Sequence, residues 1–246
     1  MVDRSYSLAL ATATPQGSVT LAHGDDVLGS SDVPQPRRHN VDLMPTIDRL
    51  CQDHSVSPSQ LGEIYLSIGP GSFTGLRIAV ATAKMLALTL NVKIVAVPTL
   101  HIVAQNAPPP LENQRDATLA VCLNLKRDTL YSGLFGFDES QCLWQPQSEP
   151  ALRTIEQIVA LVPGPLMLLG DPLPEIPASL HTSRLTILPA AMSNNRSIIV
   201  WWLGKSLAKR GQYADPASLV PLYVRPPEAQ ELWDRRLSSA ATLPSH

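Results

Sequence analysis

The residues best placed for chemistry are the glycines and hydroxyls of one turn, Gly69 to Gly75, which joins a short apolar stretch to a long helical pattern. Backbone N–H groups in such a turn, together with the dipole of the following helix, can bind a phosphate. The Walker pattern needs lysine directly after its last glycine, where this chain has Leu76. The Rossmann fingerprint has its last two glycines three apart, whereas Gly71 and Gly75 are four apart. A tight turn that allows close helix–strand packing is therefore favoured over a phosphate site.

The turn itself follows from its residue types. Pro70 and Gly71 suit the central positions of a type II turn, because proline fixes φ and glycine accepts positive φ. Ser72 or Thr74 is expected to cap the helix by accepting a hydrogen bond from a free N–H group, and for Ser72 this role is favoured over nucleophilic catalysis. The predicted glycine turn and helix cap comprise Gly69, Pro70, Gly71, Ser72, Thr74 and Gly75.

Metal and hydrolase signatures are missing from the sequence. No two of the six histidines are spaced to lie on one helical face, and the chain has no Gly-x-Ser-x-Gly elbow. His39 follows Arg37 and Arg38 at the start of a predicted helix, where it suits an anion or an acidic partner; a solvated histidine is favoured. The sequence predicts no metal site and no cofactor.

The elements that position these residues begin with three strands joined by short turns, a typical antiparallel meander. A helix follows, with Leu43, Met44, Ile47, Leu50 and Cys51 recurring on one face. The apolar stretch before the glycine turn reads as a buried strand, and a strand at 93–97 and a short helix at 99–106 follow the long helix. The first half is thus βββαβα.

The second half repeats this order after the proline-rich segment 107–110. Strands are expected at 117–123, 129–137 and 142–145, then a helix at 154–161, a strand at 166–169 and a helix at 193–210. A duplicated βββαβα unit is the layout of the ASKHA architecture of actin, Hsp70 and the sugar kinases, an α/β fold in which ATP binds between two lobes. The expected lobes are residues 1–106 and 107–246, the second ending in a proline-rich tail.

Composition limits the function classes. Charged residues make up 16% of the chain, a low share that suggests surface covered by another protein. The net charge of −2 and the lack of a basic run argue against autonomous nucleic-acid binding. Lys84 and Lys93 interrupt the longest apolar stretch, so no membrane span is expected. The three cysteines form no CxxC pair and the start of the chain lacks a signal-peptide layout, which fits a cytoplasmic protein.

The long helix has small residues at near-heptad spacing. Lys84 is its only charge after Arg77, so it is expected to be buried nearly all round, inside the fold or against a partner. Small side chains let two helices approach closely, so a helix–helix interface and internal packing are equally compatible with the spacing. The residues of this face are Gly75, Ala79, Thr82, Ala83 and Leu86.

The block Ser67 to Lys84 closely resembles the signature of the bacterial TsaB (YeaZ) family. Three shorter pieces agree with it: Arg38-His39-Asn40, Val97 to Leu100, and Pro221 to Arg225. The resemblance is weaker in the second half, where Lys126 to Tyr131 looks like a degraded form of the family's Asp-Ala-Arg hairpin. Near the first strand, Ala11-Thr12-Ala13 replaces the family's usual Asp-Thr-Ser.

The resemblance implies a two-lobed ASKHA protein that is not itself the catalyst. TsaB-like proteins pair with a TsaD-like catalytic subunit and, with a TsaE-like ATPase, support transfer of a threonylcarbamoyl group to N6 of adenosine 37 in tRNA. A homodimer in isolation and contact with tRNA only through the complex are expected. The family's dimer surface is formed by the first two helices of the N-terminal lobe, which implies an interface at His39, Leu43, Met44, Ile47, Gly75, Arg77, Ala79, Thr82, Ala83 and Leu86.

Two enzyme classes remain as alternatives. An ATP-dependent small-molecule kinase of the ASKHA architecture would carry an acidic residue after the first strand, where this chain has Thr12 and Thr14 without a carboxylate. The threonines could bond to a phosphate oxygen, but ordinary strand-end threonines are favoured. A metal-dependent peptidase would need clustered metal ligands, which the sequence does not show.

Overall fold

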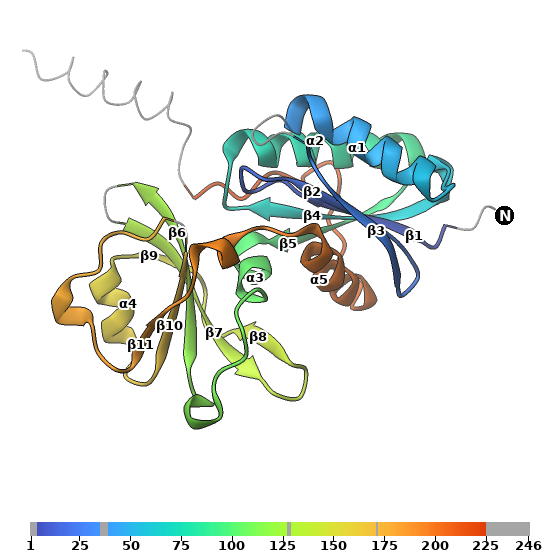
Figure 1. The fold of residues 1–246 in the computed structure, drawn as a ribbon. Coiled ribbons are helices and arrows are strands. Elements are labelled where there is room, and N and C mark those ends of the chain that lie inside the picture. Colours follow the sequence, from blue (N-terminus) through green and yellow to red (C-terminus); the bar gives the residue numbers. More distant parts are fainter. Residues whose placement is uncertain (1–3, 35–38, 127–128, 171, 225–246) are drawn as a thin grey trace, which may run out of the picture.

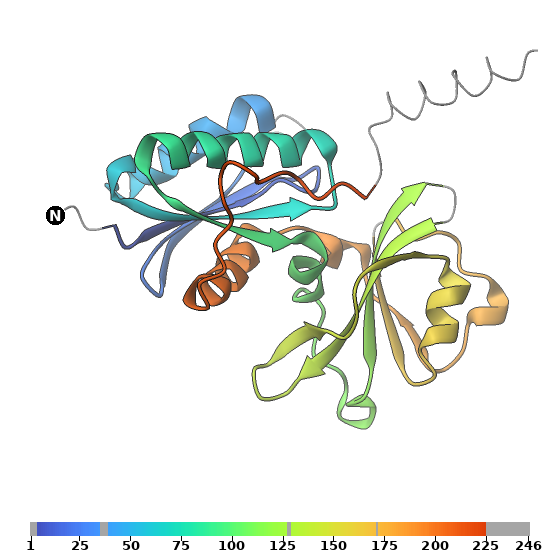
Figure 2. The same cartoon turned by 180° about the vertical axis from the view of Figure 1, so that it is seen from behind.

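The computed structural model describes residues 4–34, 39–126, 129–170 and 172–224. Two mixed β-sheets, each with helices packed on it, form two lobes joined by crossing segments (Figures 1 and 2). This arrangement confirms the expected α/β class.

The first sheet has five strands in the order β3-β2-β1-β4-β5. β1 pairs antiparallel with β2 and parallel with β4, β2 pairs antiparallel with β3, and β4 pairs parallel with β5. The strands are β1 (Tyr6–Ala11), β2 (Ser18–His23), β3 (Asp26–Asp32), β4 (Leu61–Gly69) and β5 (Lys93–Pro98). The predicted antiparallel meander is confirmed.

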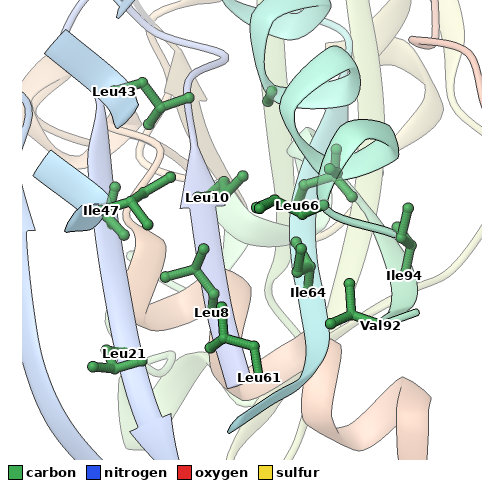
Figure 3. Close-up of a cluster of buried hydrophobic side chains, with 14 of the residues drawn as sticks. Leu8, Leu10, Leu21, Leu43, Ile47, Leu61, Ile64, Leu66, Val92 and Ile94 are labelled. Atoms are coloured by element: carbon green, nitrogen blue, oxygen red, sulfur yellow. The ribbon is translucent and has the colours of Figure 1, made fainter. Parts of the chain in front are cut away.

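Two helices cover one face of this sheet: α1 (His39–Asp53) and α2 (Phe73–Leu90). Strand side chains alternate between faces, so Leu8, Leu10, Ile64 and Leu66 all point toward these helices (Figure 3). α2 ends at Asn91, whose left-handed backbone (φ 55°) is a common helix C-cap.

The opposite face of the first sheet is covered by α5 (Ser197–Lys209), which comes from the far end of the chain (Figure 1). The alternate residues Ala9 and Ala11 are small and let this helix approach closely. At Gly204 a Cβ would lie 2.6 Å from the Tyr65 side chain, so only glycine fits the contact. The sequence predicts this helix but does not predict that it packs on the first sheet.

The second sheet has six strands, in the order β11-β10-β6-β7-β8 with β9 paired to β7. α4 (Ile155–Leu161) covers one face, and Thr154 and Gln157 cap its start reciprocally. α3 (Thr99–Ala104) packs on the other face. The strands are β6 (Thr118–Lys126), β7 (Thr129–Asp138), β8 (Leu143–Pro146), β9 (Ala151–Arg153), β10 (Leu166–Gly170) and β11 (Leu185–Ile187).

Most differences from the expected elements are short ones. β9 and β11 were not predicted, because three residues are too few to show an alternating pattern. The remaining short elements are the 3-10 helices η1 (Pro58–Gln60), η2 (Glu112–Gln114), η3 (Ala178–Leu180) and η4 (Ala190–Ser193). The division at residue 106 stays a prediction; the sheets follow it, while α5 lies on the first sheet.

The helix that bears on the expectation about membrane-spanning length is α2. Phe73–Leu90 is long and apolar enough to cross a membrane by length and composition alone, with a mean hydropathy of 1.4. The core helix of a globular protein passes the same test. α2 contributes Ala79, Val80 and Ala83 to the core between this helix and the first sheet.

Candidate functional site: the glycine turn and the outer helix face

The glycine turn is built differently from the expected type II turn. The peptide bond between Gly69 and Pro70 is cis, and the positive φ of 111° belongs to Gly69 rather than Gly71. The type II assignment is therefore wrong. Ser72 is the helix cap, since its Oγ accepts a hydrogen bond from the Gly75 N–H at 3.3 Å.

This turn is closed onto the turn between β1 and β2. The Ser72 N–H donates to the Ala13 carbonyl oxygen at 2.7 Å, and the Thr12 hydroxyl donates to the Gly75 carbonyl oxygen at 2.8 Å. A Cβ at Gly71 would lie 2.4 Å from the Ala13 oxygen. The Ser72 N–H group thus bonds to Ala13, and the Gly75 N–H group bonds to the Ser72 side chain. A phosphate in the turn would need these two N–H groups, so their contacts favour the packing interpretation of the glycines.

The last described segment, residues 213–224, runs along the first lobe and is here called the C-terminal strap (Figure 2). Ala214 pairs with Ile94 on the open edge of β5. The Lys84 ammonium donates to the Ala217 carbonyl oxygen at 3.2 Å, and the Leu222 N–H donates to the Ile68 carbonyl oxygen at 2.7 Å. The strap therefore covers a sheet edge that would otherwise be open to pairing with another chain.

An aromatic and cationic cluster fixes the far end of the strap beside the glycine turn. The Arg77 guanidinium lies 3.8 Å from the centre of the Phe73 ring and donates through Nε to the Tyr223 hydroxyl at 3.0 Å. The Phe73 and Tyr223 rings are 5.0 Å apart. Sequence reasoning identified the Pro221 to Arg225 motif but not this contact, because no local pattern links it to α2.

The near end of the strap is held by a carboxylate on β4. Glu63 accepts a hydrogen bond from the Tyr213 hydroxyl at 2.6 Å and another from the Tyr65 hydroxyl. The hydrogen bond to Glu63 raises the pKa of Tyr213 to about 12. The Lys93 ammonium lies 4.7 Å from the centre of the Tyr213 ring.

Most of the predicted interface residues face inward, which corrects the expectation that they form a surface. Leu43 and Ile47 on α1 belong to the core. On α2, Ala79 and Ala83 are fully buried and the helix buries the other small-face residues as well, namely Gly75, Thr82 and Leu86. Their small side chains let α2 lie close to the first sheet. Of the two explanations that the spacing left open, internal packing is the correct one for this face.

Other predicted residues remain available. Met44 and Arg77 have exposed side chains. His39 begins α1, but its side chain lies outside the described residues, as do Arg37, Arg38 and, in the Lys126 to Tyr131 motif, Arg127 and Asp128. Thr74 is exposed and is not the cap.

The outer faces of α1 and α2 carry a different set of apolar residues, here called the docking face. Met85 is 45% exposed and Leu88 is 83% exposed, one turn apart on α2. The helices lie side by side on the same face of the sheet (Figures 1 and 2). Exposed apolar residues grouped in this way are typical of surfaces that bind another protein. The docking face consists of Val41 and Met44 on α1 with Ala81, Met85 and Leu88 on α2.

Metal-binding groups are not assembled in the described part of the chain. No group of three or more His, Cys, Asp or Glu side chains that could hold a metal ion occurs among those residues. Thr12 and Thr14, the candidates for phosphate contact, donate to backbone carbonyl oxygens of Gly75 and Gln16. Burial raises the pKa of the Cys122 thiol to about 12, which leaves it unreactive.

Comparison with known proteins agrees with the signature residues. Residues 33–137 match the family model described as TsaD, tRNA N6-adenosine threonylcarbamoyltransferase. The chain is 29% identical over 236 residues to the tRNA threonylcarbamoyladenosine biosynthesis protein TsaB of Bacillus subtilis, covering 92% of this chain and 96% of that protein. The Escherichia coli protein of the same name is 33% identical over 100 residues, which are 41% of this chain and 43% of that one.

A solved structure shows the same fold. YeaZ from Pseudomonas aeruginosa superimposes with a TM-score of 0.70 at 25% identity, over 89% of this chain and 100% of that one. The two lobes thus have the ASKHA-type α/β fold that the duplicated element order predicts. Along nearly its whole length the chain is therefore similar to proteins of the TsaB (YeaZ) family.

Proposed function

We propose that this chain is a non-catalytic partner subunit of the machinery that makes N6-threonylcarbamoyladenosine at position 37 of tRNA. It pairs with a TsaD-like catalytic subunit and acts together with a TsaE-like ATPase in the cytoplasm. The observation that carries the proposal is the match to the Bacillus subtilis biosynthesis protein TsaB along 96% of that protein's length.

The docking face supports a role in pairing. Its exposed apolar residues lie on the two helices of the first lobe, and the model of the TsaD family matches a segment that contains both. Two related folds can pair through equivalent surfaces about an approximate twofold axis. The same face would then serve a homodimer when the chain is alone and a heterodimer with the TsaD-like subunit.

The closed glycine turn supports a non-catalytic role. The segment after β1 has threonines and no carboxylate to hold magnesium, and Thr12 bonds to the backbone of the glycine turn. These features weigh against the ASKHA kinase alternative. The net charge of −2 fits contact with tRNA through the complex rather than by this chain alone.

Reconstitution tests the proposal. The TsaD and TsaE homologues of the same organism would be combined with substrate tRNA, with and without this chain, and the modified nucleoside measured by mass spectrometry. We expect modification to depend on this chain and to be absent with this chain alone. Equal modification without the chain would contradict the proposal.

A further inference from the structure

A cavity of about 490 Å³ lies between the two lobes, on the side of the first sheet where β1 and β2 are joined. Its walls come from Gln16 and Asp32 in the first lobe, from Asn106 after α3, and from the linker 191–196 that leads into α5. Ligand pockets in proteins typically measure about 300–1,000 Å³ and often lie between lobes.

The walls carry one charge of each sign. Asp32 ends β3 and Arg196 precedes α5, and both side chains are exposed. A carboxylate and a guanidinium facing one cavity can bind a molecule that carries the opposite pair of charges. The guanidinium is suited to grip a carboxylate through two parallel hydrogen bonds.

Three carboxamides in the walls are oriented so that their oxygens remain as acceptors. Gln16 donates through Nε2 to the Val33 carbonyl oxygen at 3.1 Å, and Asn194 donates through Nδ2 to that of Ala191 at 3.1 Å. Asn106 donates to the Asn194 carbonyl oxygen at 2.7 Å, which ties the two crossing segments together. With their nitrogens engaged, these side chains offer oxygens to a donor-rich ligand.

The linker holds two buried polar atoms that have no hydrogen-bond partner within the described residues, Ser193 Oγ and Asn195 Oδ1. The Ser193 residue is 7% exposed and Asn195 is 3% exposed. The Asn195 amide nitrogen donates to Ser67 Oγ at 2.8 Å, which fixes the side chain in place. Ser193 does not line the cavity and both atoms are closed off from solvent, so this part of the linker forms a fixed wall beside the cavity.

The chemistry of the lining excludes several kinds of occupant. The walls contain no aromatic side chain on which a nucleobase could stack. A free phosphate would meet the Asp32 carboxylate and the carboxamide oxygens, which repel it. A metal ion would find a single carboxylate among the lining residues.

We propose that this cavity binds a small zwitterion of the α-amino-acid class. Its carboxylate pairs with Arg196, and its ammonium group donates to Asp32 and to the carboxamide oxygens of the walls. The side chain of the amino acid lies toward Ala191 and Met192, the apolar part of the lining.

Calorimetric titration of the full chain with each common L-amino acid tests the proposal in the absence of tRNA and partner proteins, so its result is independent of the proposed function. We expect at least one amino acid to bind with a millimolar or lower dissociation constant. Its N-acetyl and carboxamide derivatives, which lack one of the two charges, should each bind at least about tenfold more weakly.

Two variants and two matched controls locate the site. Asp32→Asn and Arg196→Gln should each weaken binding at least about tenfold, while Asp53→Asn and Arg49→Gln, which change the same kinds of side chain on α1, should leave it unchanged. All four side chains are exposed, and circular dichroism would verify that the variants fold. The proposal is overturned if no amino acid binds at millimolar concentration, or if binding survives both cavity variants.

Discussion

Ala81 and Ala83 lie two positions apart on α2 and have opposite environments. Ala83 is fully buried between α2 and the first sheet, whereas Ala81 is exposed on the docking face. The same residue type therefore carries different constraints at the two positions. In the buried position any larger side chain must displace core atoms, and in the exposed position it extends into solvent.

We predict that Ala83→Arg destabilises the fold by at least about 3 kcal/mol, because it adds both volume and an unpaired charge to the core. Ala81→Arg should change the free energy of unfolding by no more than about 0.5 kcal/mol. Urea unfolding followed by circular dichroism measures both. Equal stability of the two variants would contradict the inward orientation of Ala83.

Gly71 illustrates a residue fixed by close approach rather than by its φ angle. The Ala13 carbonyl oxygen occupies the place that a Cβ would take. Gly71→Ala must therefore push the glycine turn away from the turn after β1 and weaken the bonds of Ser72 and Thr12.

We expect Gly71→Ala to lower the free energy of unfolding by about 2 kcal/mol or more. Gly164→Ala is the control, since the nearest atom to a Cβ at Gly164 is 3.7 Å away, an ordinary contact. The control should differ from the parent by less than about 1 kcal/mol. If thermal and urea unfolding show the two variants to be alike, the two turns are not packed as described.

At the scale of elements, the C-terminal strap makes the end of the chain part of the first lobe. Ala214 pairs with the edge of β5, Ala217 accepts a hydrogen bond from Lys84 on α2, and Leu222 donates one to the end of β4. Arg77 lies at the centre of the far contact. Because its guanidinium is shared between Phe73 and Tyr223, the strap end and the start of α2 are expected to be coupled energetically.

A double-mutant cycle of Arg77→Ala and Tyr223→Phe measures that coupling. We expect an interaction free energy of about 0.5–1 kcal/mol, typical of one hydrogen bond, because Tyr223→Phe removes the hydroxyl and keeps the ring. The comparison cycle pairs Arg77→Ala with Tyr213→Phe at the other end of the strap and should be additive. Additivity in both cycles would show that the hydrogen bond between Arg77 and Tyr223 contributes nothing to stability.

For the whole molecule, the main question is which surface meets another protein. α1 and α2 present a core face to the sheet and exposed apolar residues to solvent, so on the proposed function one pair of helices both builds the lobe and pairs with another subunit. This arrangement accounts for the low share of charged residues, because part of the surface is expected to be covered.

We predict that Leu88→Arg weakens association at least about tenfold, for the homodimer and for the pair with the TsaD-like subunit, because it places a charge in the apolar docking face. Leu161→Arg on α4 is the matched control, since Leu161 is 55% exposed on the second lobe. Size-exclusion chromatography with light scattering and calorimetry measure the two associations. If the Leu88→Arg variant is folded and associates as tightly as the parent, the interface lies elsewhere.

The sequence alone predicted the order of the longer elements and showed the resemblance to the TsaB (YeaZ) family. Alternating strand residues such as Leu8 and Leu10 and the signature around the glycine turn are local patterns, and local patterns can be read directly along a chain. The helix cap could also be narrowed to Ser72 or Thr74 from the sequence, because a cap bonds to a residue only a few positions away, here Ser72 to Gly75.

Only the tertiary structure decided which face of α2 is buried, where α5 packs and what the strap covers. α2 is apolar or small nearly all round, so its sequence contains no strong signal for an inward side. The contacts of α5 with β1 and of Leu222 with Ile68 join residues from opposite ends of the chain. Such contacts depend on the shape that the whole chain adopts, because the two partners share no local pattern in the sequence.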